Sequence, residues 1–81
     1  MPRPIYEIAE DIYADWSNIG KGISPYAKPY LEAMLSLNHP SDNYVFDSGD
    51  SVIRYFLANA QTYRGEKAKQ YKSELKKQLT Y

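Results

Sequence analysis

The chain has 81 residues, a formal net charge of zero and no cysteine. This length predicts one small domain (residues 1–81), and the lack of cysteine excludes disulfides, thiolate zinc sites and cysteine nucleophiles. No apolar segment approaches the roughly 18 residues that a membrane span needs, and the N-terminal region lacks the apolar run of a secretory signal. We therefore expect a soluble, cytoplasmic protein that makes no contact with a membrane.

The charges are divided along the chain. Residues 1–53 hold three basic and eight acidic side chains, whereas residues 54–81 hold seven basic and two acidic ones. One interpretation is that the two halves pack together and partly neutralise each other. The other is that an acidic end and a basic end contact different partners.

The first predicted helix covers residues 5–16. Pro4 stands where a first helical turn accepts proline, and the early acidic residues suit the positive end of the helix dipole. Apolar side chains recur every three or four positions, as in an amphipathic helix, and form one stripe: Ile5, Ile8, Ala9, Ile12, Tyr13 and Trp16.

A loop and a shorter helix follow. Residues 17–24 contain two glycines and two serines, which favour a loop. Inside a helix Pro29 would clash with the carbonyl of residue 25, so we expect a turn over 25–28 and a helix over 29–37. The side chains expected to face the core, with Tyr30 beside them, are Leu31, Met34 and Leu35.

Residues 38–50 are the longest irregular stretch. Its short apolar island (44–46) is expected to pack on the core, and Asp47 or Ser48 is expected to cap the next helix. That helix is predicted to be the central buried one, because it is apolar over much of its circumference. Its stripe contains Ile53, Phe56, Leu57 and Ala60, widened by Val52, Asn59 and Tyr63.

Gly65 interrupts the helical pattern. Glycine inside a helix costs about 1 kcal/mol relative to alanine and is favoured just past a helix end. Residues 49–79 therefore form either one helix kinked near Gly65 or two helices, and the sequence leaves both open. The last segment, residues 66–79, has a thinner apolar stripe: Ala68, Tyr71, Leu75 and Leu79.

Together these elements predict an all-α fold, a compact bundle of three to four helices with a long 38–50 loop and a kink or break near Gly65. The sequence contains neither a strand pattern nor an internal repeat.

No pattern of residues predicts catalysis, a metal or a cofactor. His39, the single histidine, stands in an Asn-His-Pro turn and lacks a serine and acid at a triad's spacing. Asp42, Asp47 and Asp50 invite a calcium interpretation, but an EF-hand loop starting at Asp42 would need glycine at its sixth position and glutamate at its twelfth. The chain has Asp47 and Ile53 there, so we expect no metal, no cofactor and no enzymatic activity.

The lysine-rich last segment is one candidate binding surface. Lys69, Lys72 and Lys76 fall on one flank of the apolar stripe, with Arg64 and Lys67 nearby. This set could contact nucleic-acid phosphates, face solvent only, or meet a protein partner. A net charge of zero and only three arginines in the chain weigh against a reader of base edges.

The chain also contains nine tyrosines, more than a core of this size requires. Tyrosine gives a large contact area while its hydroxyl stays wet, so interfaces favour it. It can equally fill the margins of a small core. Four tyrosines fit the apolar stripes least well. These are the predicted protein-binding residues: Tyr6, Tyr26, Tyr55 and Tyr81.

Several stretches together resemble small uncharacterised proteins encoded by phages and prophages of Gram-positive bacteria. They are DWSNI (15–19), PYLEAM (29–34) and YFLANAQTYRGEKAK (55–69), which is followed by KSEL. The resemblance as a whole extends over about two thirds of the chain. The segment GKGISPYAK (20–28) departs from this pattern. The resemblance implies a phage accessory protein, and it transfers no catalytic or ligand-binding residue to this chain.

Two functions follow as hypotheses. The first is a non-enzymatic accessory protein that binds a host or phage protein, for example as an anti-CRISPR or anti-restriction inhibitor of a host-defence nuclease; a homodimer is also possible. The second is a nucleic-acid-binding accessory factor that uses the basic C-terminal helix. Salt-dependent binding to duplex DNA separates the two.

Overall fold

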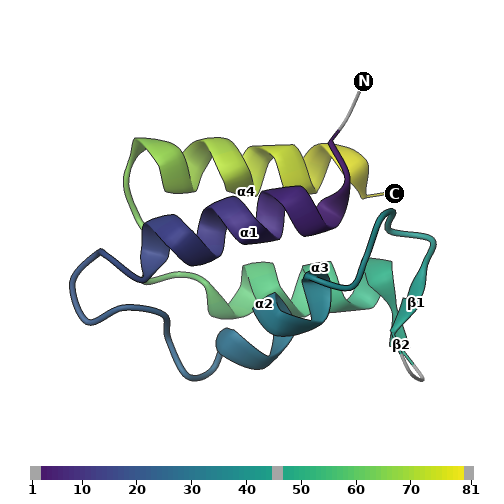
Figure 1. Ribbon diagram of the computed structural model, residues 1–81, viewed down its shortest axis with the longest axis horizontal. Helices are drawn as coiled ribbons and strands as arrows, with labels where there is room; N and C mark the ends of the chain where they lie inside the picture. The colour runs from purple at the N-terminus through teal and green to yellow at the C-terminus, as the bar shows by residue number, and fades with distance from the viewer. Residues whose placement is uncertain (1–2, 45–46, 80–81) are drawn as a thin grey trace.

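The computed structural model describes residues 3–44 and 47–79, which fold into four helices and one short strand pair. Figure 1 shows α1 and α4 side by side and antiparallel, with α2 and α3 forming a second pair that packs on α1. None of the helices in the described ranges is long and apolar enough to cross a bilayer. The elements are α1 (Ile5–Trp16), α2 (Lys28–Met34), β1 (Asn43–Tyr44), β2 (Asp47–Ser48), α3 (Gly49–Asn59) and α4 (Glu66–Gln78).

Helix α1 has the bounds that its apolar stripe predicts. Five of the six stripe residues are buried, and Tyr13 is partly buried against them. No side chain caps the start of the helix. Instead the N–H groups of Ile5 and Tyr6 donate to the carbonyls of Asn38 (3.0 Å) and Leu37 (2.8 Å). The segment after α2 therefore satisfies donors at the start of α1 that would otherwise lack partners.

Helix α2 is shorter than predicted. It ends at Met34, and residues 35–37 continue as turns whose N–H groups bond three residues back. The buried side chains Leu31, Met34 and Leu37 are spaced by three, which suits such tight turns. Leu35, predicted to face the core, is 38% exposed, because the stripe moves to Leu37.

The predicted all-α class is correct only in its broader sense, because residues 38–50 contain a strand pair. β1 and β2 pair antiparallel, with Asn43 opposite Ser48 and Tyr44 opposite Asp47. Strands of two residues are too short to show alternation in a sequence. Val45 and Phe46, two residues of the predicted apolar island, lie outside the described residues, and Tyr44 is 38% exposed.

Ser48 caps α3; it is one of the two residues predicted for this role, the other being Asp47. Its hydroxyl accepts a hydrogen bond from the N–H of Ser51 at 3.2 Å. This is the usual arrangement of a serine N-cap.

Residues 49–79 form two helices, which decides between the two possibilities left open at Gly65. α3 ends at Asn59, residues 60–65 connect the helices, and Gly65 immediately precedes α4 with a φ of 122° and a ψ of 175°. Only glycine adopts this conformation without strain. Tyr63, predicted on the stripe of α3, lies beyond the helix, yet it is fully buried.

The acidic and basic halves of the chain lie side by side. The acidic helix α1 packs along the lysine-rich α4. Arg3 joins the two, because its guanidinium donates to Asp11 (2.6 Å) and to Glu74 (2.7 Å). These ion pairs favour the interpretation that the two halves partly neutralise each other.

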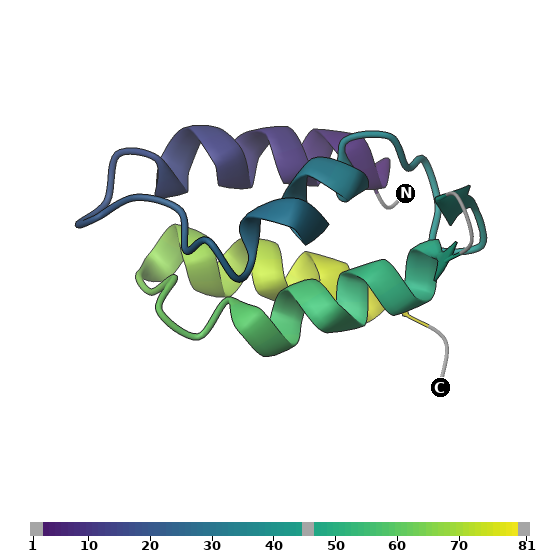
Figure 2. The ribbon, with the colours of Figure 1, turned by 90° about the horizontal axis from the view of Figure 1, so that it is seen from below.

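Figure 2 shows the loop after α1 at one end of the molecule and the strand pair at the other. The core between the helix pairs is apolar, and no buried polar side chain is found in the described part of the chain. Its largest fully buried side chains include Trp16, Tyr63 and Phe56.

Candidate functional site

The polar side chains near the N-terminus of α3 make hydrogen bonds and an ion pair within the local turns and the helix itself. The carboxylate of Asp42 accepts from the backbone N–H groups of Asn38 (2.9 Å) and His39 (3.1 Å). The exposed ring of His39 lies 2.9 Å from the hydroxyl of Ser41 and accepts from that residue's N–H. Asp50 pairs with Arg54 on α3. In residues 3–44 and 47–79, no three acidic or imidazole side chains gather as a metal would require.

Tyr63 is the centre of an aromatic cluster. Its ring stacks on Trp16 with centroids 4.8 Å apart, and the ring of Phe56 meets the indole edge-on with centroids 6.2 Å apart. Its hydroxyl donates to the carboxylate of Asp15 at 2.7 Å. Burial, and then this hydrogen bond, raise the pKa of Tyr63. The tyrosine is therefore a structural residue that fastens the 60–65 connection to α1.

Lys72, a predicted phosphate contact, is already bound within the fold. Its ammonium group donates to the carbonyls of Ala60 (2.7 Å) and Tyr63 (2.6 Å), and it lies 5.6 Å from the centre of the Tyr63 ring. These carbonyls follow the end of α3, where a positive charge is favourable. Burial, and then the charges of Lys76 and Arg64, lower the pKa of Lys72.

The rest of the predicted basic set is divided between two sides of α4. Lys67 lines a shallow depression together with Asp11 and Asp15 of α1. Arg64, Lys69 and Lys76 are exposed. Lys67 is exposed as well, so four of the five predicted cations are exposed. The three that do not line the depression, Arg64, Lys69 and Lys76, are called the outer flank below.

Two of the four predicted interface tyrosines are exposed, one on the segment before α2 and one on α3. Tyr26, which is 75% exposed, lines a shallow depression with Ala58 and Asn59, one helical turn beyond Tyr55. Tyr55 is 53% exposed, and its ring lies 5.6 Å from that of Tyr30 on α2. We call Tyr26, Tyr30 and Tyr55 the tyrosine face.

The other two predicted tyrosines are not part of this face. Tyr6 is partly buried on the first turn of α1, and no ring contact joins it to the tyrosine face within the described ranges. Tyr81 lies outside the described residues. The sequence predicted Tyr30 only at the edge of the core. Both Tyr26 and Tyr30 follow a proline, in the Pro-Tyr pairs 25–26 and 29–30, and this repeat is the feature that could have grouped the two tyrosines.

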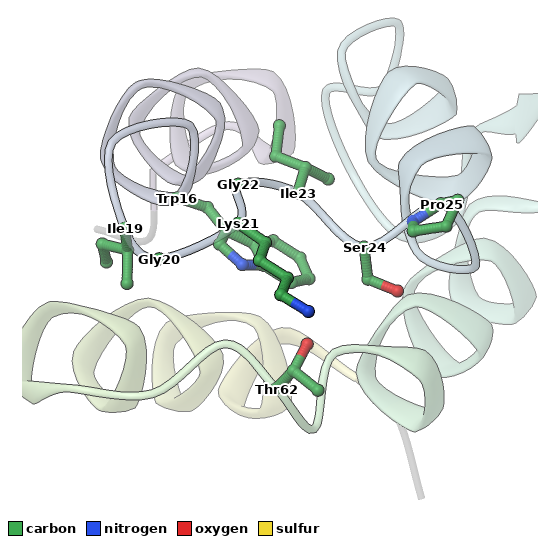
Figure 3. A pocket seen from close by; sticks show the side chains of 9 residues that line it. All are labelled: Trp16, Ile19, Gly20, Lys21, Gly22, Ile23, Ser24, Pro25 and Thr62. Carbon is green, nitrogen blue, oxygen red and sulfur yellow. The ribbon is translucent and has the colours of Figure 1, made fainter.

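A pocket of about 330 Å³ lies where the loop after α1 passes over the connection between α3 and α4 (Figure 3). Trp16 contributes an edge to its base, since the indole as a whole is only 2% exposed. In Figure 3 the side chain of Lys21 extends from the loop toward the hydroxyl of Thr62. Sequence reasoning missed this pocket; the run IGKGI (19–23) close behind a tryptophan is the feature that could have indicated it.

No family model, curated protein or solved structure matches the chain. The resemblance to small phage and prophage proteins therefore stays a prediction.

Proposed function

We propose that the chain is a non-enzymatic binding protein that holds a protein partner through the tyrosine face. An inhibitor of a host-defence nuclease would be one protein of this kind. The observation that carries the proposal is the exposure of two aromatic rings, Tyr26 (75%) and Tyr55 (53%), which are the most exposed large apolar side chains in the described part of the chain.

The composition of this face suits a protein interface. Tyrosine is enriched in the buried centres of such interfaces, because a rigid ring gives contact area at little cost in side-chain entropy. Tyr30 and Tyr55 already contact each other, so their rings are held in place before a partner arrives. Such preorganisation reduces the ordering cost of binding.

The proposal is tested with the double variant Tyr26→Ala/Tyr55→Ala. Hot-spot residues at the centre of an interface cost about 2 kcal/mol or more each on truncation, so the loss of two is expected to reduce affinity by roughly 1,000-fold. Tagged wild-type chain is used to capture proteins from bacterial extracts, and the affinity of each captured protein is then measured by calorimetry. Far-UV circular dichroism checks that helicity is unchanged.

The matched control is Tyr44→Ala, because Tyr44 is also partly exposed (38%) but lies on β1. The control is expected to bind like the wild type. A partner that binds all three chains equally would refute a role for the tyrosine face.

Sedimentation of the pure chain tests whether the partner is a second copy. The proposal expects a monomer at micromolar concentration. A dimer that the double variant converts to a monomer would assign the tyrosine face to self-association instead.

The second candidate is phosphate binding by the outer flank of α4. It is favoured by the exposed cations Arg64, Lys69 and Lys76, two of which lie close enough to Lys72 to lower its pKa. Three phosphate contacts predict a slope of about −3 in log affinity against log salt for duplex DNA. Lys69→Ala/Lys76→Ala is expected to reduce that slope by about 2 and Lys67→Ala to leave it unchanged. No DNA binding at low salt would eliminate this candidate.

A further inference from the structure

The pocket beside Trp16 has apolar walls and a few polar groups that can donate hydrogen bonds. Its walls include the apolar side chains of Ile19, Ile23 and Pro25, and its base includes the edge of Trp16. Besides the indole N–H of Trp16, its polar side-chain groups are the ammonium of Lys21 and the hydroxyls of Ser24 and Thr62. None of the described lining residues carries a carboxylate.

The loop backbone adds hydrogen-bond donors to this lining. The N–H groups of Gly20, Lys21 and Ile23 have no acceptor within the part of the chain that the structure describes, whereas that of Gly22 bonds to the carbonyl of Ile19 at 2.8 Å. Gly20 and Lys21 are adjacent, and neighbouring loop amides without partners are groups that commonly hold anions. Together with the Lys21 ammonium they make the polar part of the pocket a set of donors.

We propose that this pocket binds a small anion with an apolar body, such as an aromatic carboxylate. The negative group would be held by the Lys21 ammonium and the loop amides, and the apolar body would lie against Ile23, Pro25 and the edge of Trp16. The volume of about 330 Å³ accommodates roughly ten non-hydrogen atoms, since a water molecule in the liquid takes about 30 Å³. This site uses none of the tyrosines, although Ser24 and Thr62 also line the depression beside Tyr26.

Benzoate is a suitable probe, and benzyl alcohol is its uncharged counterpart. The chain has a single tryptophan, so its fluorescence reports on this pocket directly. Glycine amide signals in a nitrogen–proton correlation spectrum report the place of binding. We expect a saturable change in tryptophan emission with benzoate. The signals of Gly20 and Gly22 are expected to shift, while those of Gly49 and Gly65, which lie outside the pocket, stay in place.

Two variants test the assigned roles. Lys21→Met keeps the length of the side chain and removes its charge, so benzoate is expected to bind roughly five- to tenfold more weakly. Lys28→Met, which changes an exposed lysine outside the pocket, is expected to bind benzoate like the wild type.

Three results would overturn the proposal. They are the absence of any saturable change with benzoate at millimolar concentration, equal binding of benzyl alcohol and benzoate, and shifts confined to signals outside the pocket. A loss with Lys28→Met equal to that with Lys21→Met would show that net charge, rather than this pocket, attracts the anion. Each outcome is separate from the capture experiment on the tyrosine face.

Discussion

Replacing Tyr63 with alanine is expected to lower the free energy of unfolding by about 3–5 kcal/mol, the usual range for removing a buried aromatic ring. Tyr63 is fully buried, stacks on Trp16 and donates to Asp15, so the change removes core packing and a hydrogen bond together. A domain of this size rarely has more than about 3–5 kcal/mol of stability in total. The variant should therefore be largely unfolded, as measured by urea denaturation followed by circular dichroism.

Tyr63→Phe is the conservative counterpart, since it keeps the ring and removes the hydroxyl that contacts Asp15. Its expected cost is about 1–2 kcal/mol at neutral pH. A cost near zero for Tyr63→Ala would show that the connection between α3 and α4 is not anchored by this ring.

We also expect the stability difference between the wild type and Tyr63→Phe to depend on pH. The pKa of Tyr63 is raised in the folded chain above the value near 10 that holds when the chain is unfolded. The unfolded state therefore loses this proton first, and the contribution of Tyr63 is present below pH 10 and declines as the pH rises further. The stability difference between wild type and Tyr63→Phe should shrink above pH 10, by up to about 1.4 kcal/mol per pH unit.

Gly49→Ala is expected to destabilise the fold by about 1–3 kcal/mol, the cost of overpacking a tight site. A Cβ at this position would lie 2.9 Å from the carbonyl oxygen of Pro40 and 3.0 Å from that of Asp42. Backbone oxygens cannot turn aside as a long side chain can, and both are engaged: they accept from the N–H groups of Asp50 (2.8 Å) and Gly49 (2.6 Å). Relief requires the 38–42 segment to move.

Such a movement would also disturb α1, because the carbonyl of Asn38 holds the N–H of Ile5. Thermal unfolding measures the loss, and hydrogen exchange at the start of α1 shows whether it spreads there. Asn43→Ala, an exposed change in the neighbouring strand, is the control and should stay within about 0.5 kcal/mol of wild type. Equal stability of Gly49→Ala would mean that the segment yields without cost.

Several features could be predicted because their causes are local. The spacing of isoleucines in residues 5–16 places one apolar face on a helix, and α1 has those bounds. Ser48 was one of two predicted caps, and glycine at position 65 marked a kink or a break, which the structure shows to be a break, since both depend on the chemistry of one or two residues.

Other features could not be predicted because their causes are distant in the chain. Lys72 has the sequence of a solvated helix face, but its ammonium group is held by carbonyls nine and twelve residues earlier. The tyrosine face forms because α2 packs along α3, which brings Tyr30 to Tyr55. The pocket beside Trp16 requires a loop and a connection that are separated by about forty residues of sequence.

The sequence by itself determined which segments coil and which sides of them are apolar, because helix formation and capping depend on neighbours within a few residues. Only the tertiary structure decided which of the remaining polar and aromatic groups stay available to other molecules. Tyr63 and Lys72 are used within the fold, whereas Tyr26, Tyr55 and Lys21 remain on the surface. The reason is physical: burial and hydrogen bonding are properties of pairs of groups, and the pairs form only when the helices pack.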